Sequence, residues 1–292
     1  MHRFGGHTMS GRLRRVLVKR PIEAFGSDEQ IAQQWRDLAY LAPPNLDRAA
    51  DEHAHFVALL ERAGAEVAYL PADPRTGLDS IYTHDPALIT DAGVITFHMS
   101  KTARQGEGPA LADALPALEA PLLGRVQAPG TAEGGDMIWL DAHTLAVGRT
   151  YRTNLQGIEQ LRALLAPLDV TLLEAPLVHW SGPADVLHLM SIISLLDDDL
   201  AVVYARLLPI PFRQMLLDRG IELVEIPDEE FPSQGCNVLA LAPRLCLMLT
   251  GNPVTQQRLE AAGCEVWTYP GDEISFKGSG GPTCLTRPLW RE

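Results

Sequence analysis

The chain has 292 residues, of which 46% are hydrophobic and 21% are charged, and its formal net charge at neutral pH is −13. This balance fits one large or two small globular domains, and no apolar run reaches the roughly 18 residues that a membrane helix needs. A strong negative charge without a clustered basic face argues against nucleic acid binding. It favours a cationic small-molecule partner, although acidity also serves solubility alone.

The first eleven residues predict a disordered tail followed by one domain. They are basic, contain the glycine-rich stretch GGHTMSG and lack the apolar core of a secretory signal. The four cysteines show no CxxC spacing, so neither a zinc ribbon nor a redox motif is expected. We therefore expect a tail over residues 1–11, a domain over residues 12–292, free thiols in the cytoplasm, and no metal or other cofactor.

The predicted elements repeat one plan of two apolar strands, a helix and a third strand. The segment 16–21 reads as a strand, and the helix 47–64 leads into the strand 65–71. A clear hairpin over 85–100 opens the next group, and a proline-interrupted stretch over 109–124 predicts a short helix.

The plan is most regular in the middle of the chain. Strands are predicted over 136–141 and 144–150, a helix over 155–168 that Asn154 can cap, and a strand over 170–176. The two groups after it keep this order, with elements predicted over 188–195, 200–208, 211–220 and 221–227, and then over 237–243, 245–251, 255–263 and 264–270.

Five polar residues at near-equal spacing each begin a group. They are Asp85, Asp136, His188, Asn237 and Cys284, and the intervals are 136 − 85 = 51, 188 − 136 = 52, 237 − 188 = 49 and 284 − 237 = 47. A period of this size indicates stacked or radially arranged units. If the units surround one axis, these five positions converge at its centre.

The fifth group is split between the two ends of the sequence. The segment 284–289 supplies its first strand and the segment 16–21 its second, so pairing them would close a ring without a free sheet edge. We therefore predict an α/β fold: a five-bladed pseudo-symmetric propeller of ββαβ units. A doubly wound open sheet would also alternate strands and helices, but it explains neither the paired strands nor the split group.

Convergence would place a nucleophile beside an acid–base group. Gly278, Gly280 and Gly281 permit the tight backbone turns that present Cys284 to a ligand. A nucleophilic cysteine must be a thiolate, which needs a cationic neighbour such as His188 or the substrate. Taken alone, the histidine would read as a satisfied core residue, and the other three cysteines read as small buried hydrophobes.

Carboxylates at the same centre predict the charge of the substrate. Asp85, Glu133 and Asp136 would repel a thiolate unless a cation lay between them, and a planar guanidinium pairs best with carboxylates. For Asp85, which precedes a proline, capping of a turn is the simpler alternative. The predicted reaction has the thiolate add to the guanidinium carbon and His188 protonate the departing amine. Water then hydrolyses the thiouronium adduct.

The motifs DPAL, EGGD, LHL and GGxxC, in this order, resemble the guanidine-modifying enzymes of the pentein superfamily. That superfamily has a five-bladed α/β propeller and includes arginine deiminases, amidinotransferases and dimethylarginine dimethylaminohydrolases. The chain is most similar to the last group. It lacks room for the helical domain typical of the deiminases, and it has Met190 where the deiminases and amidinotransferases usually carry a second acid.

The resemblance implies roles for individual residues. It makes Cys284 the nucleophile, His188 the acid and base, and Asp85 and Glu133 the ligands of the guanidinium, while Asp136 holds the loop. The segments SKTARQGE and GRTYRTNLQG resemble two of that family's segments. By this match Arg104 and Arg152 bind the α-carboxylate of the substrate. One departure is His84, where these families commonly have arginine or glutamate.

Several alternatives remain open at this point. An arginine deiminase or an amidinotransferase would act on another guanidino compound, and an inactive protein of the same fold would bind without turnover. A metal-dependent guanidine hydrolase is disfavoured, because the close pair His53 and His55 lies on a predicted helix at a spacing that points the rings apart. Neither GxSxG nor a P-loop motif is present. A homo-oligomer is compatible with the sequence.

Overall fold

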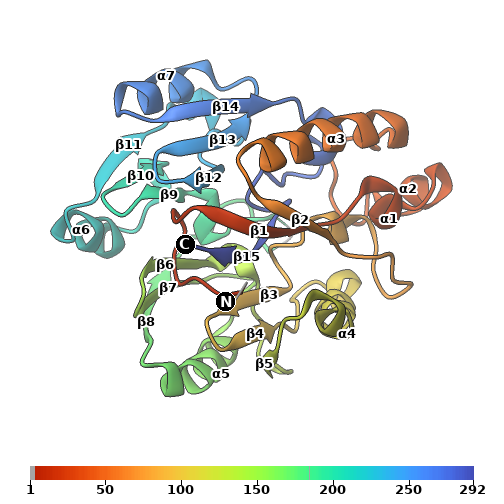
Figure 1. Cartoon of the computed structure of the whole chain (residues 1–292), viewed down its shortest axis with the longest axis horizontal. Coiled ribbons are helices and arrows are strands. Elements are labelled where there is room, and N and C mark those ends of the chain that lie inside the picture. The colour runs from red at the N-terminus through yellow and green to blue at the C-terminus, as the bar shows by residue number, and fades with distance from the viewer. Residues whose placement is uncertain (1–3, 184) are drawn as a thin grey trace.

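Five three-stranded sheets form a ring in the computed structural model, which describes residues 4–183 and 185–292 (Figure 1). In each sheet the middle strand pairs antiparallel with the first strand and parallel with the strand that follows the helix. The ββαβ unit is therefore confirmed in all five positions, and with it the predicted α/β propeller.

Each sheet takes its strands from one sequence group. The strands are β3 (Ala87–Thr90), β4 (Gly93–Thr96) and β5 (Leu122–Arg125); β6 (Met137–Asp141), β7 (Thr144–Arg149) and β8 (Thr171–Pro176); β9 (Ile193–Asp197), β10 (Leu200–Val203) and β11 (Glu222–Glu225); β12 (Val238–Ala242), β13 (Leu245–Leu249) and β14 (Glu265–Tyr269); and β15 (Arg287–Arg291), β1 (Leu13–Val18) and β2 (Glu66–Tyr69).

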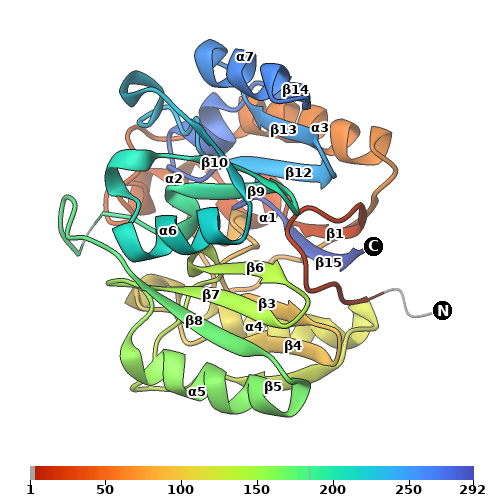
Figure 2. The same cartoon turned by 90° about the vertical axis from the view of Figure 1, so that its left-hand side faces the viewer.

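The helices lie at the rim of the ring, with α7 and α5 at opposite extremes of the side view (Figure 2). In the order of the sheets above, the unit helices are α4 (Glu107–Ala114), α5 (Leu155–Leu165), α6 (Ile210–Asp218), α7 (Pro253–Ala261) and α3 (Leu46–Arg62), and α1 (Pro21–Phe25) and α2 (Asp28–Gln34) precede α3. Short single-turn helices connect them: η1 (Leu78–Ile81), η2 (Thr102–Arg104), η3 (Leu115–Leu118), η4 (Gly134–Asp136), η5 (Ala166–Leu168), η6 (Leu189–Ser191), η7 (Ala205–Leu207), η8 (Asp228–Glu230) and η9 (Asp272–Phe276).

The burial of the strands shows which of them lie inside the ring and which lie at its rim. Every residue of β4 and β10 is buried, which is the pattern of a strand covered on both faces, whereas the outer strand β8 has exposed positions. Each of the five unit helices buries at least one apolar side chain. In α3, for example, Phe56 and Leu60 are fully buried and lie four residues apart on one face.

Pairing of β15 with β1 closes the ring, as the split fifth group predicted. Leu13 lies opposite Arg291 and Leu17 opposite Arg287, and the backbone N–H of Glu292 donates to the carbonyl of Arg12. The expected absence of a free sheet edge is wrong, because each of the five sheets is separate and keeps two edge strands. The pairing completes the fifth blade, and the five first strands lie around a common centre (Figure 1).

Local expectations are met in part. The stretch 109–124 contains the expected short helix, because α4 ends at Ala114; η3 follows, and the chain turns through a left-handed residue, Glu119 (φ 53°), before β5. The strand expected from His188 begins only at Ile193, since η6 intervenes. Two short helices, α1 and α2, precede α3 and were not anticipated.

The segment before β1 is also more ordered than expected. The ring of His7 stacks on Trp139 with centroids 4.0 Å apart, and the N–H of Gly5 donates to the carbonyl of Leu289 at 2.8 Å. Residues 4–11 of the expected tail therefore pack against the ring, whereas residues 1–3 lie outside the described part of the chain. Among the described residues, no helix combines the length and the apolar character needed to cross a bilayer.

Candidate active site

One pocket brings together three of the residues that the sequence singled out: Asp85, His188 and Cys284. They belong to three different sheets, since Asp85 precedes β3, His188 precedes η6 and β9, and Cys284 precedes β15. Arg104, which the resemblance placed at the substrate carboxylate, lines the same pocket. The ring thus assembles the predicted group from positions as far apart in sequence as 85 and 284.

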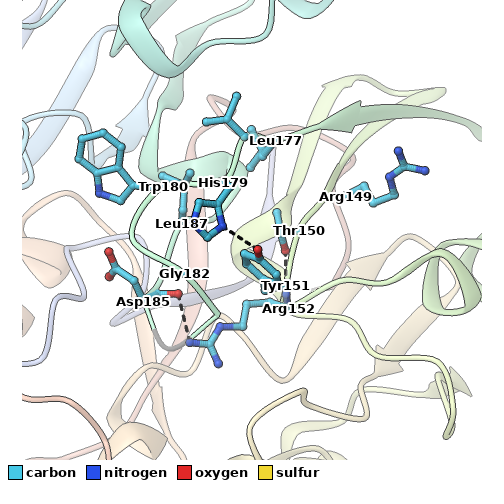
Figure 3. Close-up of a pocket in the computed structure, with 11 residues that line it drawn as sticks. Arg149, Thr150, Tyr151, Arg152, Leu177, His179, Trp180, Gly182, Asp185 and Leu187 are labelled. Carbon is cyan, nitrogen blue, oxygen red and sulfur yellow. Dashed lines mark hydrogen bonds between the residues drawn. The ribbon is translucent and has the colours of Figure 1, made fainter.

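A second, neighbouring pocket contains Arg152 (Figure 3). The two pockets share Asp185, whose backbone carbonyl accepts a hydrogen bond from Arg152 Nη2 at 3.4 Å. Arg152 Nη1 lies 3.4 Å from the hydroxyl of Ser100, which in turn donates to Glu133 Oε1 at 3.0 Å. Glu133 is fully buried behind the first pocket rather than on its wall.

The glycine-rich loop before β15 delivers the sulfur of Cys284 to the first pocket. A Cβ at Gly281 would lie 2.4 Å from the side chain of Asn237, and one at Gly280 would lie 2.2 Å from the ring of Tyr82. Only glycine allows these close approaches. Cys284 is partly exposed there, whereas the other three cysteines are buried.

Asn237 links this loop to the neighbouring unit. Its Nδ2 donates to the sulfur of Cys284 at 3.4 Å, and its Oδ1 accepts from the N–H of Thr283 at 3.1 Å and from the hydroxyl of Thr283 at 2.6 Å. Sequence reasoning placed Asn237 in the repeat but gave it no role. The amide holds the sulfur in place and donates a hydrogen bond that favours a thiolate.

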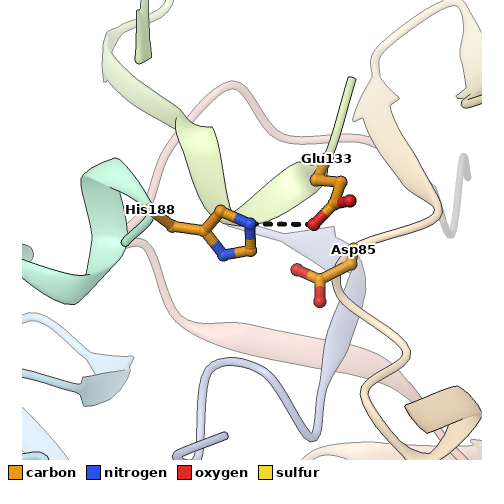
Figure 4. Close-up of side chains that lie close together, drawn as sticks. All are labelled: Asp85, Glu133 and His188. Atoms are coloured by element: carbon orange, nitrogen blue, oxygen red, sulfur yellow. Dashed lines mark hydrogen bonds and ion pairs between the residues drawn. The ribbon is translucent and has the colours of Figure 1, made fainter. Parts of the chain in front are cut away.

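His188 and Glu133 form an ion pair beside Asp85 (Figure 4). His188 Nε2 lies 2.9 Å from Glu133 Oε2, and the backbone N–H and hydroxyl of Ser100 bind the other carboxylate oxygen. A Cβ at Gly135 would lie 2.2 Å from Nδ1 of the imidazole, so the second glycine of EGGD is needed for the ring to pack there. The contact fixes the orientation of the imidazole.

The electrostatic surroundings of His188 favour its protonated form. Burial opposes the charge, but Asp136, the hydrogen bond to Glu133, and Asp85 outweigh it and raise the pKa of His188 to about 9. Burial also opposes the charge on Glu133, yet the bond to His188 keeps its pKa below the usual range. At neutral pH the pair is therefore an imidazolium beside a carboxylate, which is suited to donating a proton.

Asp85 is held by a buried network of charges. Arg104 Nη1 donates to Asp85 Oδ2 at 2.9 Å, and the N–H of Gly135 lies 3.3 Å from Oδ1. The rest of the Arg104 guanidinium forms a two-pronged pair with Glu107, with both distances 2.8 Å. The network ties the carboxylate of Asp85 to the pocket wall and occupies the guanidinium of Arg104.

The thiol of Cys284 is a poor nucleophile in the substrate-free protein. Burial raises the pKa of Cys284 to about 11, and the negative charge of Asp85 adds to that rise, while the hydrogen bond from Asn237 opposes it. A cation placed between the sulfur and Asp85 would remove the unfavourable electrostatic contribution. The site therefore suits a substrate that brings its own positive charge.

Asp136 has the structural position that the resemblance implied. Its oxygens accept from the hydroxyls of Thr150 and Thr153, both at 2.7 Å, and from the N–H of Leu189 at 3.0 Å. Burial nevertheless raises the pKa of Asp136 to about 6. Because Leu189 follows His188, Asp136 fixes the backbone that carries the histidine.

Two positions that the sequence comparison used lie away from the pocket. His84 Nδ1 contacts the carbonyl of Thr286 at 2.9 Å and its Nε2 lies 3.1 Å from Arg287, so its side chain is held among core groups. Burial and the charge of Arg287 lower the pKa of His84 well below its usual value. Met190 packs in the apolar core between sheets.

Asp79 and Lys101 also line the pocket and were not anticipated. Asp79 lies in η1 and is buried, and Lys101 directly precedes η2 with its Nζ 3.7 Å from Asp79 Oδ2. Neither residue falls at a repeat position. Polar character six residues before Asp85 is too weak a sequence signal to single out Asp79.

Asp85, Glu133 and His188 could in principle ligate a metal ion. Their donor atoms lie within 4.8 Å of one another, and two carboxylates with an imidazole form a reasonable ligand set. Their lone pairs, however, already face partners: Arg104 binds Asp85, and Ser100 and His188 bind Glu133. The arrangement fits an organic cation better, and a metal-free site stays a prediction.

Comparison with known proteins agrees with this geometry. The family model described as "N,N dimethylarginine dimethylhydrolase, eukaryotic" matches residues 25–291. The N(G),N(G)-dimethylarginine dimethylaminohydrolase of Pseudomonas aeruginosa is 26% identical over 248 residues, which cover 85% of this chain and 91% of that protein. An arginine deiminase of Mycobacterium avium is 29% identical over 190 residues, covering 55% of this chain and 46% of the deiminase.

Solved structures support the fold. A variant of the Pseudomonas aeruginosa enzyme in complex with citrulline superposes with a TM-score of 0.74 at 21% identity, covering 94% of this chain and 98% of the other. The pentein fold expected from the motifs is thereby confirmed. With its family model spanning nearly the whole sequence, the chain belongs to the dimethylarginine dimethylaminohydrolase family.

Proposed function

We propose that this chain hydrolyses N,N-dimethylarginine to citrulline and dimethylamine through a covalent adduct on Cys284. The observation that carries the proposal is the single pocket shared by Cys284, His188 and Asp85 in a chain of this family. The relative from Pseudomonas aeruginosa bears the name of the same reaction. All five units contribute a residue to the site or its support, which favours one catalytic domain over residues 12–292.

The guanidinium of the substrate binds between Asp85 and the sulfur of Cys284. Asp85 supplies a carboxylate for its N–H groups, and the negative charge of Glu133 behind His188 adds to the attraction. The cation offsets the effect of Asp85 on the thiol, so Cys284 loses its proton to solvent only when substrate is present. Activation of the nucleophile is thereby coupled to binding.

The thiolate then adds to the central guanidinium carbon and forms a carbon–sulfur bond. His188, protonated beside Glu133, transfers its proton to the dimethylamino nitrogen. The carbon–nitrogen bond breaks, dimethylamine leaves, and a cationic thiouronium adduct remains on Cys284. The neutral His188 takes a proton from water, and the resulting hydroxide attacks the same carbon. Collapse of this intermediate breaks the carbon–sulfur bond, the hydroxyl proton passes to solvent, citrulline is released and the thiolate is regenerated.

The α-amino acid end of the substrate lies toward the second pocket. We propose that Arg152 contributes to binding its α-carboxylate, as the resemblance implied. The guanidinium of Arg104 is engaged by Asp85 and Glu107, so the geometry supports a role for Arg104 in positioning Asp85. The partner is thus a small cationic guanidino compound, and the four free cysteines favour a cytoplasmic location.

The direct test is product identification with the purified full chain. Incubation with N,N-dimethylarginine is expected to yield citrulline and dimethylamine in equal amounts. Cys284→Ser is expected to abolish turnover, because a serine hydroxyl is far less acidic than a thiol. Cys236→Ala is the matched control, since that cysteine is buried in the core away from the pocket. Turnover that persists in Cys284→Ser would exclude the covalent mechanism.

Arginine is the second substrate to include, because arginine deiminases are among the relatives. Ammonia released from arginine faster than dimethylamine from dimethylarginine would indicate a deiminase. Transfer to an added amine in preference to water would indicate an amidinotransferase. Saturable binding of dimethylarginine without product would indicate a binding protein of the same fold.

A further inference from the structure

Two short segments carry the groups that the reaction has to bring together. Residues 83–87 hold Asp85, and residues 284–287 begin with Cys284. We propose that His84 and Arg287 form a clamp between these segments and act as positioning residues that set the separation of the sulfur from the carboxylate. This assignment rests on the proposed function, because Cys284 is the nucleophile there and Asp85 binds the guanidinium.

Regular strand pairing does not connect the two segments. Asp85 leads into β3 and Cys284 into β15, and in the described part of the chain no strand of the sheet β3–β5 pairs with a strand of the sheet that holds β15. The side chains of Asp85 and Cys284 are held by Arg104 and Asn237, which come from other loops. The separation of the two segments therefore depends on the contacts that they make with each other.

His84 binds the opposite segment through its backbone and its side chain. Its backbone N–H donates to the carbonyl of Cys284 at 3.2 Å, and its Nδ1 lies 2.9 Å from the carbonyl of Thr286. A carbonyl can only accept, so Nδ1 carries the ring proton, and Nε2 accepts the hydrogen bond from Arg287 Nη2 at 3.1 Å. The ring is therefore neutral, in keeping with the burial and the charge of Arg287 that lower the pKa of His84.

Arg287 binds in the reverse direction. Its Nη1 donates to the carbonyl of His84 at 3.1 Å and to that of Ala87 at 2.5 Å, and these two residues flank Asp85 in the chain. The buried guanidinium therefore holds the turn that carries the carboxylate. Because Arg287 lies three residues after Cys284, a shift of the segment that carries the nucleophile would break these bonds.

Position 84 needs a side chain that both donates and accepts. A carboxylate there would accept from Arg287 but could not donate to the carbonyl of Thr286, and a second guanidinium would place two like charges together in a buried site. A neutral imidazole with its proton on Nδ1 satisfies both partners. The match accounts for His84 at a position where related families commonly carry arginine or glutamate.

The test measures the alignment of Cys284 with Asp85 without relying on turnover. Chloroacetamidine and chloroacetamide both alkylate a thiol: a carbon–sulfur bond forms, chloride leaves, and the thiol proton passes to solvent. Only the amidine is a cation that Asp85 can bind. The ratio of the two alkylation rates at Cys284, followed by mass spectrometry of the peptide that contains it, therefore reports how well a bound cation is placed against the sulfur.

In His84→Leu we expect this ratio to fall about tenfold to a hundredfold, the range for a reacting group displaced by about 1 Å. The rate with the neutral amide should stay within about twofold of the wild type, since the thiol itself is intact. The kcat for N,N-dimethylarginine should fall by a factor similar to that of the ratio, with KM within about threefold, because binding at Asp85 survives. His84→Gln, which keeps one donor and one acceptor, should restore most of the ratio.

A second variant tests whether the two residues act as one unit. Arg287→Met should lower the ratio as His84→Leu does, and the double variant should lose little more than either single variant. Additive losses in the double variant would overturn the clamp. If His84→Leu does not fold, His84→Glu takes its place with the same expected fall, since it keeps the acceptor for Arg287 and loses the donor to Thr286.

Leu216→Ala is the control for lost stability, because Leu216 is buried in α6 of another unit. It should lower the melting temperature and leave the ratio unchanged. An unchanged ratio in His84→Leu, an equal fall with both reagents, or the same fall of the ratio in Leu216→Ala would overturn the proposal.

Failure of the proposed function is distinguishable from failure of the clamp. If the wild type prefers the amidine but does not turn over dimethylarginine, the substrate assignment fails, and the ratio in the variants still tests His84 and Arg287. If dimethylarginine is turned over and the ratio is the same in wild type and His84→Leu, the clamp alone fails. A wild type without preference for the cation would overturn the clamp together with the guanidinium site at Asp85.

Discussion

The sheets β3–β5 and β6–β8 each place an aspartate just before their first strand, yet the two aspartates have different surroundings. Asp85 lines the pocket, and its carboxylate faces the buried guanidinium of Arg104. Asp136 is fully buried, and two hydroxyls and a backbone N–H occupy its oxygens. Position in the repeat brings a side chain to the centre, and residues from the loops decide whether it can reach a ligand.

The largest effect is expected at the aspartate that faces the pocket. Asp85→Asn removes the charge that pairs with the substrate guanidinium and leaves Arg104 short of a partner. We expect kcat/KM for dimethylarginine to fall by about 30-fold to 1,000-fold, the range for breaking a buried charged pair. Steady-state kinetics with a thermal melt of the same sample checks this. A fall of less than fivefold would mean that the two aspartates do not differ in role.

Asp136→Asn should act mainly on stability. One acceptor oxygen is lost, so a hydroxyl or the N–H of Leu189 is left without a partner, and the free energy of unfolding should drop by about 1–3 kcal/mol. Because the charge of Asp136 helps to raise the pKa of His188, the alkaline limb of the kcat profile should also move to lower pH. Urea unfolding and a pH–rate profile measure the two effects. A raised KM with normal stability would contradict the structural role.

The His188–Glu133 pair links the two aspartates and should make stability depend on pH. The folded pKa of His188, about 9, exceeds the unfolded value near 6.5, so the stabilisation is full below about pH 6.5 and is lost as the pH rises through about 9. His188→Gln should therefore cost about 1–3 kcal/mol more at pH 6 than at pH 10.

Urea unfolding at the two pH values checks this expectation. His143→Gln serves as the control for the substitution itself, since His143 is exposed on the turn between β6 and β7. Equal destabilisation by His188→Gln at pH 6 and pH 10 would show that the imidazole is not held in its charged form.

The smallest effect is expected at Thr150, one of the two hydroxyls that bind Asp136. Thr150→Val removes the donor at 2.7 Å and the oxygen that accepts from the backbone N–H groups of Arg152 at 2.9 Å and Thr153 at 3.1 Å, while Thr153 still donates to Asp136. We therefore expect a loss of about 1–2 kcal/mol in the free energy of unfolding. Thr171→Val, at an exposed position of β8, is the matched control and should have little effect. A large loss of activity in Thr150→Val would place the Asp136 network closer to the chemistry than its burial indicates.

The repeat made the ring and the convergence of Asp85, His188 and Cys284 predictable. Alternating apolar residues indicate buried strands, and a glycine at the end of a helix indicates that the chain reverses there. These features repeat at intervals of 47 to 52 residues. The closing pair β15–β1 followed from the same pattern. Local pattern was therefore sufficient for the architecture and for the position of the nucleophile.

Contacts between loops were not predictable in this way. Nothing in SKTARQGE shows that Arg104 turns back to Glu107 and Asp85 while Lys101 faces the pocket, because that choice depends on the path of η2. Stacking of His7 on Trp139 joins residues 132 positions apart and gives no local signal. A resemblance transfers residue types, but the partners of each side chain must come from the structure.

Closure of the ring by β15 and β1 has a consequence for how the protein can be rearranged. The backbone N–H of Glu292 donates to the carbonyl of Arg12, so β15 and β1 come together where a short linker would join them. A circular permutant, with these two ends joined by a short linker and new termini opened in an exposed hairpin turn, would retain all five blades. The ribosome would synthesise the blades of the permutant in a different order. The distances among the thiol of Cys284, the imidazole of His188 and the carboxylate of Asp85 would be preserved.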